Sequence, residues 1–156
     1  MKKILVCLLT LALLFSFTAC ASISAKEASS SLEITKADFS KFIARFSDTD
    51  TPEGPCYTVN IENINNETKE IEFTVSFVGV KSSPVYSTDK IKAVIADDNT
   101  ASFNWTDSWK NEGTGVIKIN PDDSSKIEIL MTITKEAEVN RATLSTKDEY
   151  RVLTKR

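Results

Sequence analysis

Apolar and polar side chains alternate with a period of two along most of the chain after residue 56, which is typical of strands with one buried face. The clearest run covers residues 71–77, where the apolar positions are Ile71, Phe73, Val75 and Phe77. Comparable runs cover residues 57–61, 91–95, 101–105, 117–119 and 127–133, and weaker ones surround Leu144 and Val152. Clusters of Asn, Asp, Ser and Pro separate these runs and indicate short turns.

A helical period precedes the strands. Thr35 is a candidate N-cap with Asp38 three residues later, and the apolar residues that follow recur at helical spacing: Phe39, Phe42, Ile43 and Phe46. We predict one amphipathic helix of about three turns that packs on the sheet, with docking into a partner's groove as the alternative. Two prolines and a glycine within residues 52–55 end it.

Together these patterns predict an all-β fold with one short N-terminal helix. Strands joined by short turns pair antiparallel, because a parallel pair needs a long crossover and no long helix separates the runs. We therefore expect an antiparallel meander of about eight strands, as a small barrel or a two-sheet sandwich. Large inward side chains favour a packed interior over an open cup: Phe73, Phe77, Phe103 and Trp105.

The first 19 residues have the form of a secretory signal. Lys2 and Lys3 precede an uncharged stretch, residues 4–19, in which thirteen of sixteen residues are apolar. Thr18, Ala19 and Cys20 then end the apolar run and are followed by small residues. The pattern predicts export from the cytoplasm.

These residues resemble a bacterial lipoprotein signal, in which Leu-(Ala/Ser/Thr)-(Gly/Ala)-Cys precedes the cleavage site. Thr18, Ala19 and Cys20 match, whereas Phe17 replaces the usual leucine. The resemblance implies cleavage before Cys20, diacylglycerol on its sulfur and an acyl chain such as palmitate on its amino group. Such a protein is held by its lipid at the extracytoplasmic face of the cell membrane. Cleavage after a later alanine and an uncut membrane anchor are the alternatives.

The rest of the chain divides into a tether and one domain. Residues 20–34 comprise the lipidated cysteine and a flexible segment with five serines among residues 21–34, and residues 35–156 form a single β-rich domain. Cys56 then has no partner, which predicts a buried, inert thiol. If Cys20 carries no lipid, a Cys20–Cys56 disulfide becomes possible.

Charge and composition exclude several classes of function. The 156 residues contain 19 basic and 22 acidic side chains, a formal charge of −3, which argues against nucleic-acid binding. Loss of two signal lysines makes the charge −5, so attachment to an anionic membrane would depend on the lipid. The chain has no histidine, which excludes Ser–His–Asp and Cys–His catalysis and histidine metal sites.

The segment between two predicted strands, residues 102–115, is the candidate contact site. Trp105 continues the inward set of its strand and is expected in the core or at the barrel end, with a ligand or partner contact as the alternative. Trp109 lies in a polar loop, where it is either a ligand platform or a plug over the barrel mouth. Asp107, Lys110 and Asn111 would surround it with polar groups able to orient a sugar or a peptide.

The same segment carries a second resemblance, over Trp105–Ile119. An aromatic strand, an acidic turn with tryptophan and the motif Asn-x-Gly-x-Gly at Asn111, Gly113 and Gly115 are similar to small Firmicutes lipoproteins of uncharacterised function. The Asp-Gly-Trp-Gly step of such proteins is replaced here at residues 107–110 by Asp-Ser-Trp-Lys. The resemblance implies a lipocalin-like β domain and supplies no known catalytic residues that could be transferred to this chain.

Acidic residues cluster in places without forming a recognisable metal site. Asp97 with Asp98 and Asp122 with Asp123 are ordinary turn residues, and the group Asp48, Asp50 and Glu53 lacks the spacing of a calcium loop. We therefore expect neither a metal nor another cofactor.

The sequence predicts a lipid-anchored envelope protein whose non-enzymatic domain binds an unknown protein or glycan, or has a structural role. A lipocalin-like carrier of a small apolar ligand is the first alternative. A histidine-free hydrolase that uses paired carboxylates is the second.

Overall fold

The computed structural model describes residues 37–49, 55–79, 85–138 and 144–156, all of which belong to the segment Thr35–Arg156. The predicted signal and tether, residues 1–34, lie outside the described residues. In the described part of the chain, no helix has the length and apolar character needed to span a membrane.

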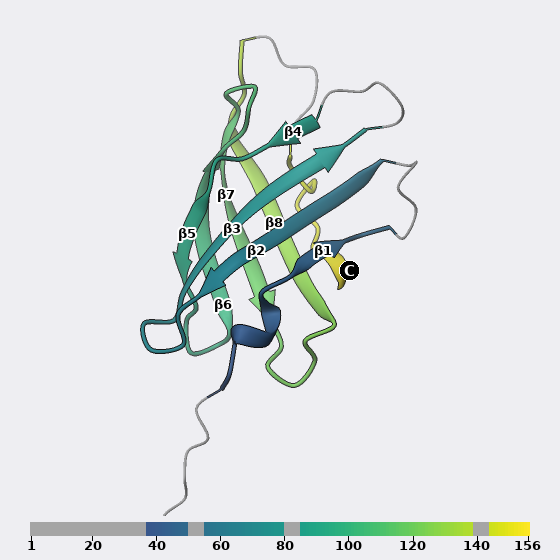
Figure 1. Ribbon diagram of the computed structural model, residues 1–156. Helices are drawn as coiled ribbons and strands as arrows, with labels where there is room; N and C mark the ends of the chain where they lie inside the picture. The colour runs from purple at the N-terminus through teal and green to yellow at the C-terminus, as the bar shows by residue number, and fades with distance from the viewer. Residues whose placement is uncertain (1–36, 50–54, 80–84, 139–143) are drawn as a thin grey trace, which may run out of the picture. The chain divides into compact units, whose positions relative to one another are not determined.

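Nine strands run through the described residues and pair only antiparallel (Figure 1). They are β1 (Arg45–Ser47), β2 (Cys56–Ile64), β3 (Glu70–Val78), β4 (Val85–Ser87), β5 (Ile91–Val94), β6 (Thr100–Thr106), β7 (Glu112–Ile119), β8 (Lys126–Lys135) and β9 (Arg151–Lys155). The sheet order is β4-β3-β2-β1-β9-β8-β7-β6, with β5 beside β3. Neighbours in sequence thus pair throughout most of the sheet, and β9 pairs with β1. This is the predicted antiparallel meander, and the all-β fold class is confirmed.

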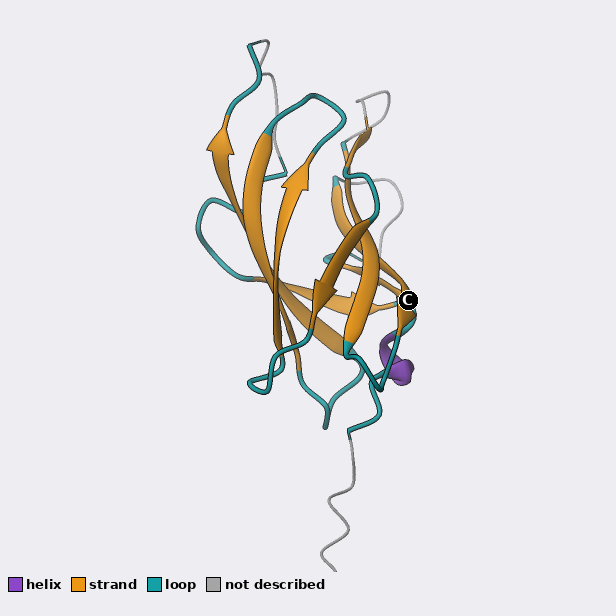
Figure 2. Ribbon diagram, turned by 90° about the vertical axis from the view of Figure 1, so that its left-hand side faces the viewer, coloured by secondary structure: helices purple, strands orange, loops and turns teal. Residues whose placement is uncertain are grey.

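The sheet curls into a partly closed barrel, as Figure 2 shows. It is one sheet, not two, and its ladder is interrupted between β5 and β6. An isolated bridge joins Thr88 to Asp107 at one end of this seam, where the Ser108 amide also donates to the Ser87 carbonyl at 2.9 Å. At the other end, the Ala96 amide donates to the Thr100 carbonyl at 2.7 Å.

The predicted leading helix is present only as a single 3-10 turn, η1 (Ser40–Phe42), and the chain is extended again at β1. Thr35, the predicted cap, lies outside the described residues. One turn followed by a strand is enough to bury Phe39, Phe42 and Phe46. The sheet also supplies partners for the backbone, because β1 pairs with both β2 and β9. A longer helix would forgo those ladder bonds.

Alternate strand residues fill the interior, in the phase that the sequence predicts for most strands. Phe73 and Ile129 are fully buried, and the Phe73 ring meets Phe103 edge to face at 5.0 Å between centroids. The last strand differs, because Leu153 is buried opposite Ile127 and Val152 is 53% exposed. The other side chains buried to below 2% exposure include Phe42, Phe46, Ile61, Ile71, Ile95, Ile117, Ile127, Met131 and Leu144.

Candidate functional site

Asp107 and Asn111 point into the protein and shape the turn that follows β6. Both are buried, with 3% and 0% exposure. One Asp107 carboxylate oxygen accepts from the amides of Trp109 and Asn111 at 2.9 and 3.0 Å, and the other accepts from the Asn111 side-chain amide at 2.8 Å. The Asn111 side-chain oxygen accepts from the Ala137 amide at 2.9 Å. These two predicted contact residues therefore hold the loop together from within.

Lys110 is exposed and adopts a left-handed backbone, with φ at 71°. Its amide donates to the Asp107 carbonyl at 2.9 Å, which closes the turn. This is one of the two positions where the resembled lipoproteins have glycine, the residue that takes this conformation without strain. The tight turn is present here without the glycine.

Trp109 is half-buried and ends a row of four aromatic rings. The row runs from Tyr57 to Phe77, Tyr86 and Trp109, with centroid separations of 6.4, 6.4 and 5.9 Å. At its buried end the Tyr57 hydroxyl donates to the Leu144 carbonyl at 2.6 Å, and burial raises the pKa of Tyr57 so that this proton stays in place. Trp109 thus packs on the core and keeps part of its indole at the surface. Its contact role stays a prediction.

Trp105 is a core residue, as the strand phase predicts, with 3% exposure. It pairs with Gly113 across the β6–β7 ladder, and Phe103 pairs with Gly115 in the same way. The Trp105 indole N–H donates to the Thr114 carbonyl at 2.9 Å. Both motif glycines therefore lie against interior aromatic rings, which accounts for them structurally.

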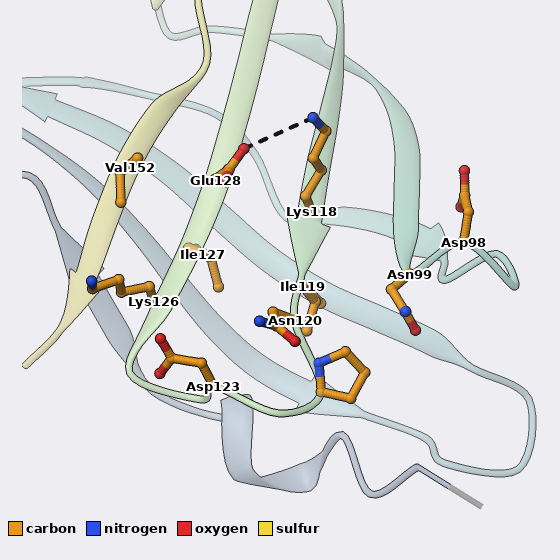
Figure 3. A pocket seen from close by; sticks show the side chains of 11 residues that line it. Asp98, Asn99, Lys118, Ile119, Asn120, Asp123, Lys126, Ile127, Glu128 and Val152 are labelled. Carbon is orange, nitrogen blue, oxygen red and sulfur yellow. Dashed lines mark ion pairs between the residues drawn. The ribbon is translucent and has the colours of Figure 1, made fainter.

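A surface pocket of about 380 Å³ lies beside the ends of β7, β8 and β9 (Figure 3). Its lining combines the apolar side chains of Ile119 and Ile127 with charged side chains of both signs. Lys118 and Glu128 approach each other to 3.8 Å across the β7–β8 ladder. The remaining lining residues are Asp98, Asn99, Asn120, Pro121, Asp123, Lys126 and Val152. No motif signals this pocket, because separate turns and strands contribute to it.

The acidic residues of this region serve their own turns. Hydrogen bonds from Thr100 lower the pKa of Asp98, and those from Ser125 lower the pKa of Asp123. Asp48, from the third acidic group, binds Arg151 at 2.6 Å instead. The other two members of that group lie outside the described residues. Within the part of the chain that the structure describes, no three His, Cys, Asp or Glu side chains gather as a metal site.

Of the cysteines, only Cys56 lies in the described ranges, and the prediction that it is buried is confirmed by its 8% exposure. Its sulfur lies 3.9 Å from the Thr58 hydroxyl. Cys20, the predicted lipid site, falls outside these ranges.

The chain matches no family model, no curated protein and no solved structure. Any role of Trp109 or of the pocket therefore has to be argued from their own surroundings. Trp109 offers a partly exposed ring on a rigid turn, and the pocket offers an open surface with charges of both signs.

Proposed function

We propose that the chain is an exported lipoprotein of the cell envelope whose β domain is a non-enzymatic binding or structural module. The observation that carries the proposal is Thr18-Ala19-Cys20 directly after an uncharged apolar run. Lipid on Cys20 would hold the protein at the extracytoplasmic face of the membrane, with residues 20–34 as the connection to the domain.

The packing of the domain supports a scaffold whose contacts are external. The interior positions are occupied by large side chains, such as Phe73 against Phe103 and Phe42 at 0% exposure. A carrier of an apolar ligand would need the volume that these side chains fill. The pocket beside β7–β9 and the partly exposed Trp109 offer surfaces for such contacts.

Metabolic labelling with a fatty-acid analogue tests the anchor. We expect label on the wild type and none on Cys20→Ala, because the thioether to diacylglycerol needs that sulfur. Cys7→Ala is the matched control: this cysteine leaves with the signal, so the variant should be labelled like the wild type. Intact mass should place the mature amino terminus at Cys20. Label retained in Cys20→Ala, or an unlabelled wild type, would contradict the proposal.

A further inference from the structure

Four cations and one exposed isoleucine gather where the chain enters the β domain. Lys41 belongs to η1, Arg45 begins β1, Lys126 begins β8 and Lys155 ends β9, and all four are exposed. Ile43 lies between the first two and is 44% exposed. We call these five residues the basic face.

Backbone contacts bring the members of this face together. The Lys155 ammonium donates to the Lys41 carbonyl at 2.7 Å, and the Lys155 amide donates to the carbonyl of Ser125, the residue before Lys126, at 2.8 Å. Lys155 also pairs with Phe46, the buried neighbour of Arg45, in the β1–β9 ladder, so the two cations lie at the same end of adjacent strands. Both ribbon views accordingly place the C-terminal strand end beside β1 and near η1 (Figures 1 and 2).

The positive charge of the basic face is not neutralised by ion pairs. Lys41 and Lys155 donate to the backbone carbonyls of Pro121 and Lys41, which carry no net charge. Among the described residues, none of the four cations forms an ion pair. Lys41 acts on Asp38 and Lys126 on Asp123, but hydrogen bonds within their own turns contribute more to the lowered pKa of both carboxyls. Asp122, which follows Pro121, is a further exposed carboxylate at this end.

Cations elsewhere on the sheet behave differently. Those that pair with carboxylates are Lys69, Lys90, Lys92, Lys118, Lys135 and Arg151. Two further exposed lysines of the described ranges, Lys110 and Lys147, also form no ion pair, but each stands singly in a turn. The basic face is thus the place where several unpaired cations come together, although the chain as a whole has a formal charge of −3. A net charge of that sign does not describe the local field at this end.

We infer that the basic face docks on the anionic phospholipid surface of the membrane that holds the anchor, an inference that rests on the function proposed above. Lysine and arginine beside an exposed apolar side chain are typical of surfaces that lie at a lipid headgroup layer. Each such cation strengthens binding to an anionic bilayer by about fivefold.

The chain connectivity identifies that membrane as the occupant. Only sixteen residues separate Cys20 from Ala37, where the described domain begins, and Lys41 follows four residues later. Even fully extended, such a segment reaches about 60 Å, so the basic face is held close to the bilayer. A weak electrostatic contact becomes effective at the high local concentration that a short connection gives.

A fluorescence-quenching measurement tests this orientation in the full-length protein purified from membranes and placed in vesicles. A thiol fluorophore is attached at Ile43→Cys, in a Cys56→Ala background, and a nitroxide quencher is carried by a lipid headgroup. The vesicles are phosphatidylcholine, with or without about one third phosphatidylglycerol. Val94→Cys, 57% exposed on β5, is the matched probe site elsewhere on the domain.

We expect phosphatidylglycerol to raise quenching at residue 43 at least about threefold over residue 94, and about 0.5 M salt to abolish the difference. Arg45→Glu should remove it, whereas Lys147→Glu, the same change of charge at another exposed site, should keep it. Equal quenching at the two probe sites, or quenching that ignores phosphatidylglycerol, would overturn the inference. If the probe at residue 43 responds to soluble heparin alone, the assignment of the basic face to a lipid surface would be overturned.

The mass of the same preparation separates this inference from the proposed anchor. Acylated protein with equal quenching at both sites keeps the anchor and overturns the basic face. Unacylated protein that binds the anionic vesicles through residue 43 keeps the basic face and overturns the anchor.

Discussion

Trp105 lies directly across the β6–β7 ladder from Gly113, and its indole occupies the space that a side chain at residue 113 would fill. A Cβ at that position would overlap with the Trp105 indole and with the Thr132 carbonyl oxygen. Phe103 covers Gly115 in the same way, and a Cβ there would overlap with its ring. Two glycines thus allow two large rings to lie flat against the strand.

We predict that Gly113→Ala lowers the free energy of unfolding by about 2–3 kcal/mol, because overpacking of a core forces side chains and backbone to shift. The Thr132 carbonyl belongs to the adjacent strand β8 and cannot move aside without cost. Urea unfolding followed by fluorescence measures the loss.

Thr114→Ala is the control, since Thr114 is exposed and only its backbone carbonyl accepts the Trp105 N–H. We expect it to stay within about 0.5 kcal/mol of the wild type. Equal losses at residues 113 and 114 would mean that the indole does not occupy the glycine's space.

Lys110→Gly is predicted to stabilise the domain by about 0.5–1 kcal/mol. Lys110 holds φ at 71°, where a Cβ is strained, and glycine relieves that strain at some cost in chain entropy. Lys110→Ala removes the same charge but keeps the Cβ, so it should give no comparable gain. Thermal unfolding of both variants measures the difference. If alanine stabilises as much as glycine, the gain comes from the charge.

The strands and their inward faces were predictable where the alternation is long, as at Phe73 and Ile129. The strands β1 and β4 were not, because three residues are too few to show a period and their pairing partners create them. In the leading segment a period is present, but it predicts the wrong element. Its aromatic spacing suits a helix, yet Phe46 is also satisfied in a strand that pairs with β2.

The candidate site was predictable only in part, because burial of polar groups depends on the turn that they form. Asp107 and Asn111 were expected to face a ligand, since polar residues in a polar loop usually face solvent. Their mutual hydrogen bonds and those to backbone amides remove the cost of burial. The pocket in Figure 3 depends on tertiary contacts between distant segments and carries no local signal.

Two exposed carboxylates should respond differently to salt. A hydrogen bond from the Lys69 ammonium at 2.8 Å lowers the pKa of Asp97, whereas hydrogen bonds from Ser125 chiefly lower the pKa of Asp123. We predict that about 1 M NaCl returns the pKa of Asp97 toward its ordinary value and leaves that of Asp123 lowered. Carboxyl chemical shifts followed by NMR measure both; equal changes would contradict the assignment.

The same shifts give a sign for the pH dependence of stability. A carboxyl whose pKa is lower in the folded chain binds fewer protons there than in the unfolded chain, so it stabilises the fold above its unfolded pKa. That contribution is lost as the pH falls through the folded value. We therefore expect the urea concentration at the unfolding midpoint to decrease once the pH falls below about 4. It should decrease less in Asp123→Asn.

The last prediction separates the structural role of Trp109 from a role in binding. Trp109→Ala should cost about 1.5–2.5 kcal/mol, roughly half the cost for a fully buried tryptophan, because the ring packs on Tyr86 at 5.9 Å and is only half-buried. Trp109→Phe keeps an aromatic ring at that place and should cost less than about 1 kcal/mol. The phenylalanine variant is therefore the informative one, since it preserves the loop while removing the indole N–H and the outer part of the ring.

Co-sedimentation of the detergent-solubilised protein with isolated envelope fragments supplies the second measurement. If Trp109 contacts a partner, Trp109→Phe should remain stable and lose sedimentation, because binding energy at interfaces concentrates on such residues. Thr114→Ala should sediment like the wild type. If instead the wild type and Trp109→Phe sediment equally while Trp109→Ala loses only stability, Trp109 closes the end of the aromatic row and binds nothing there.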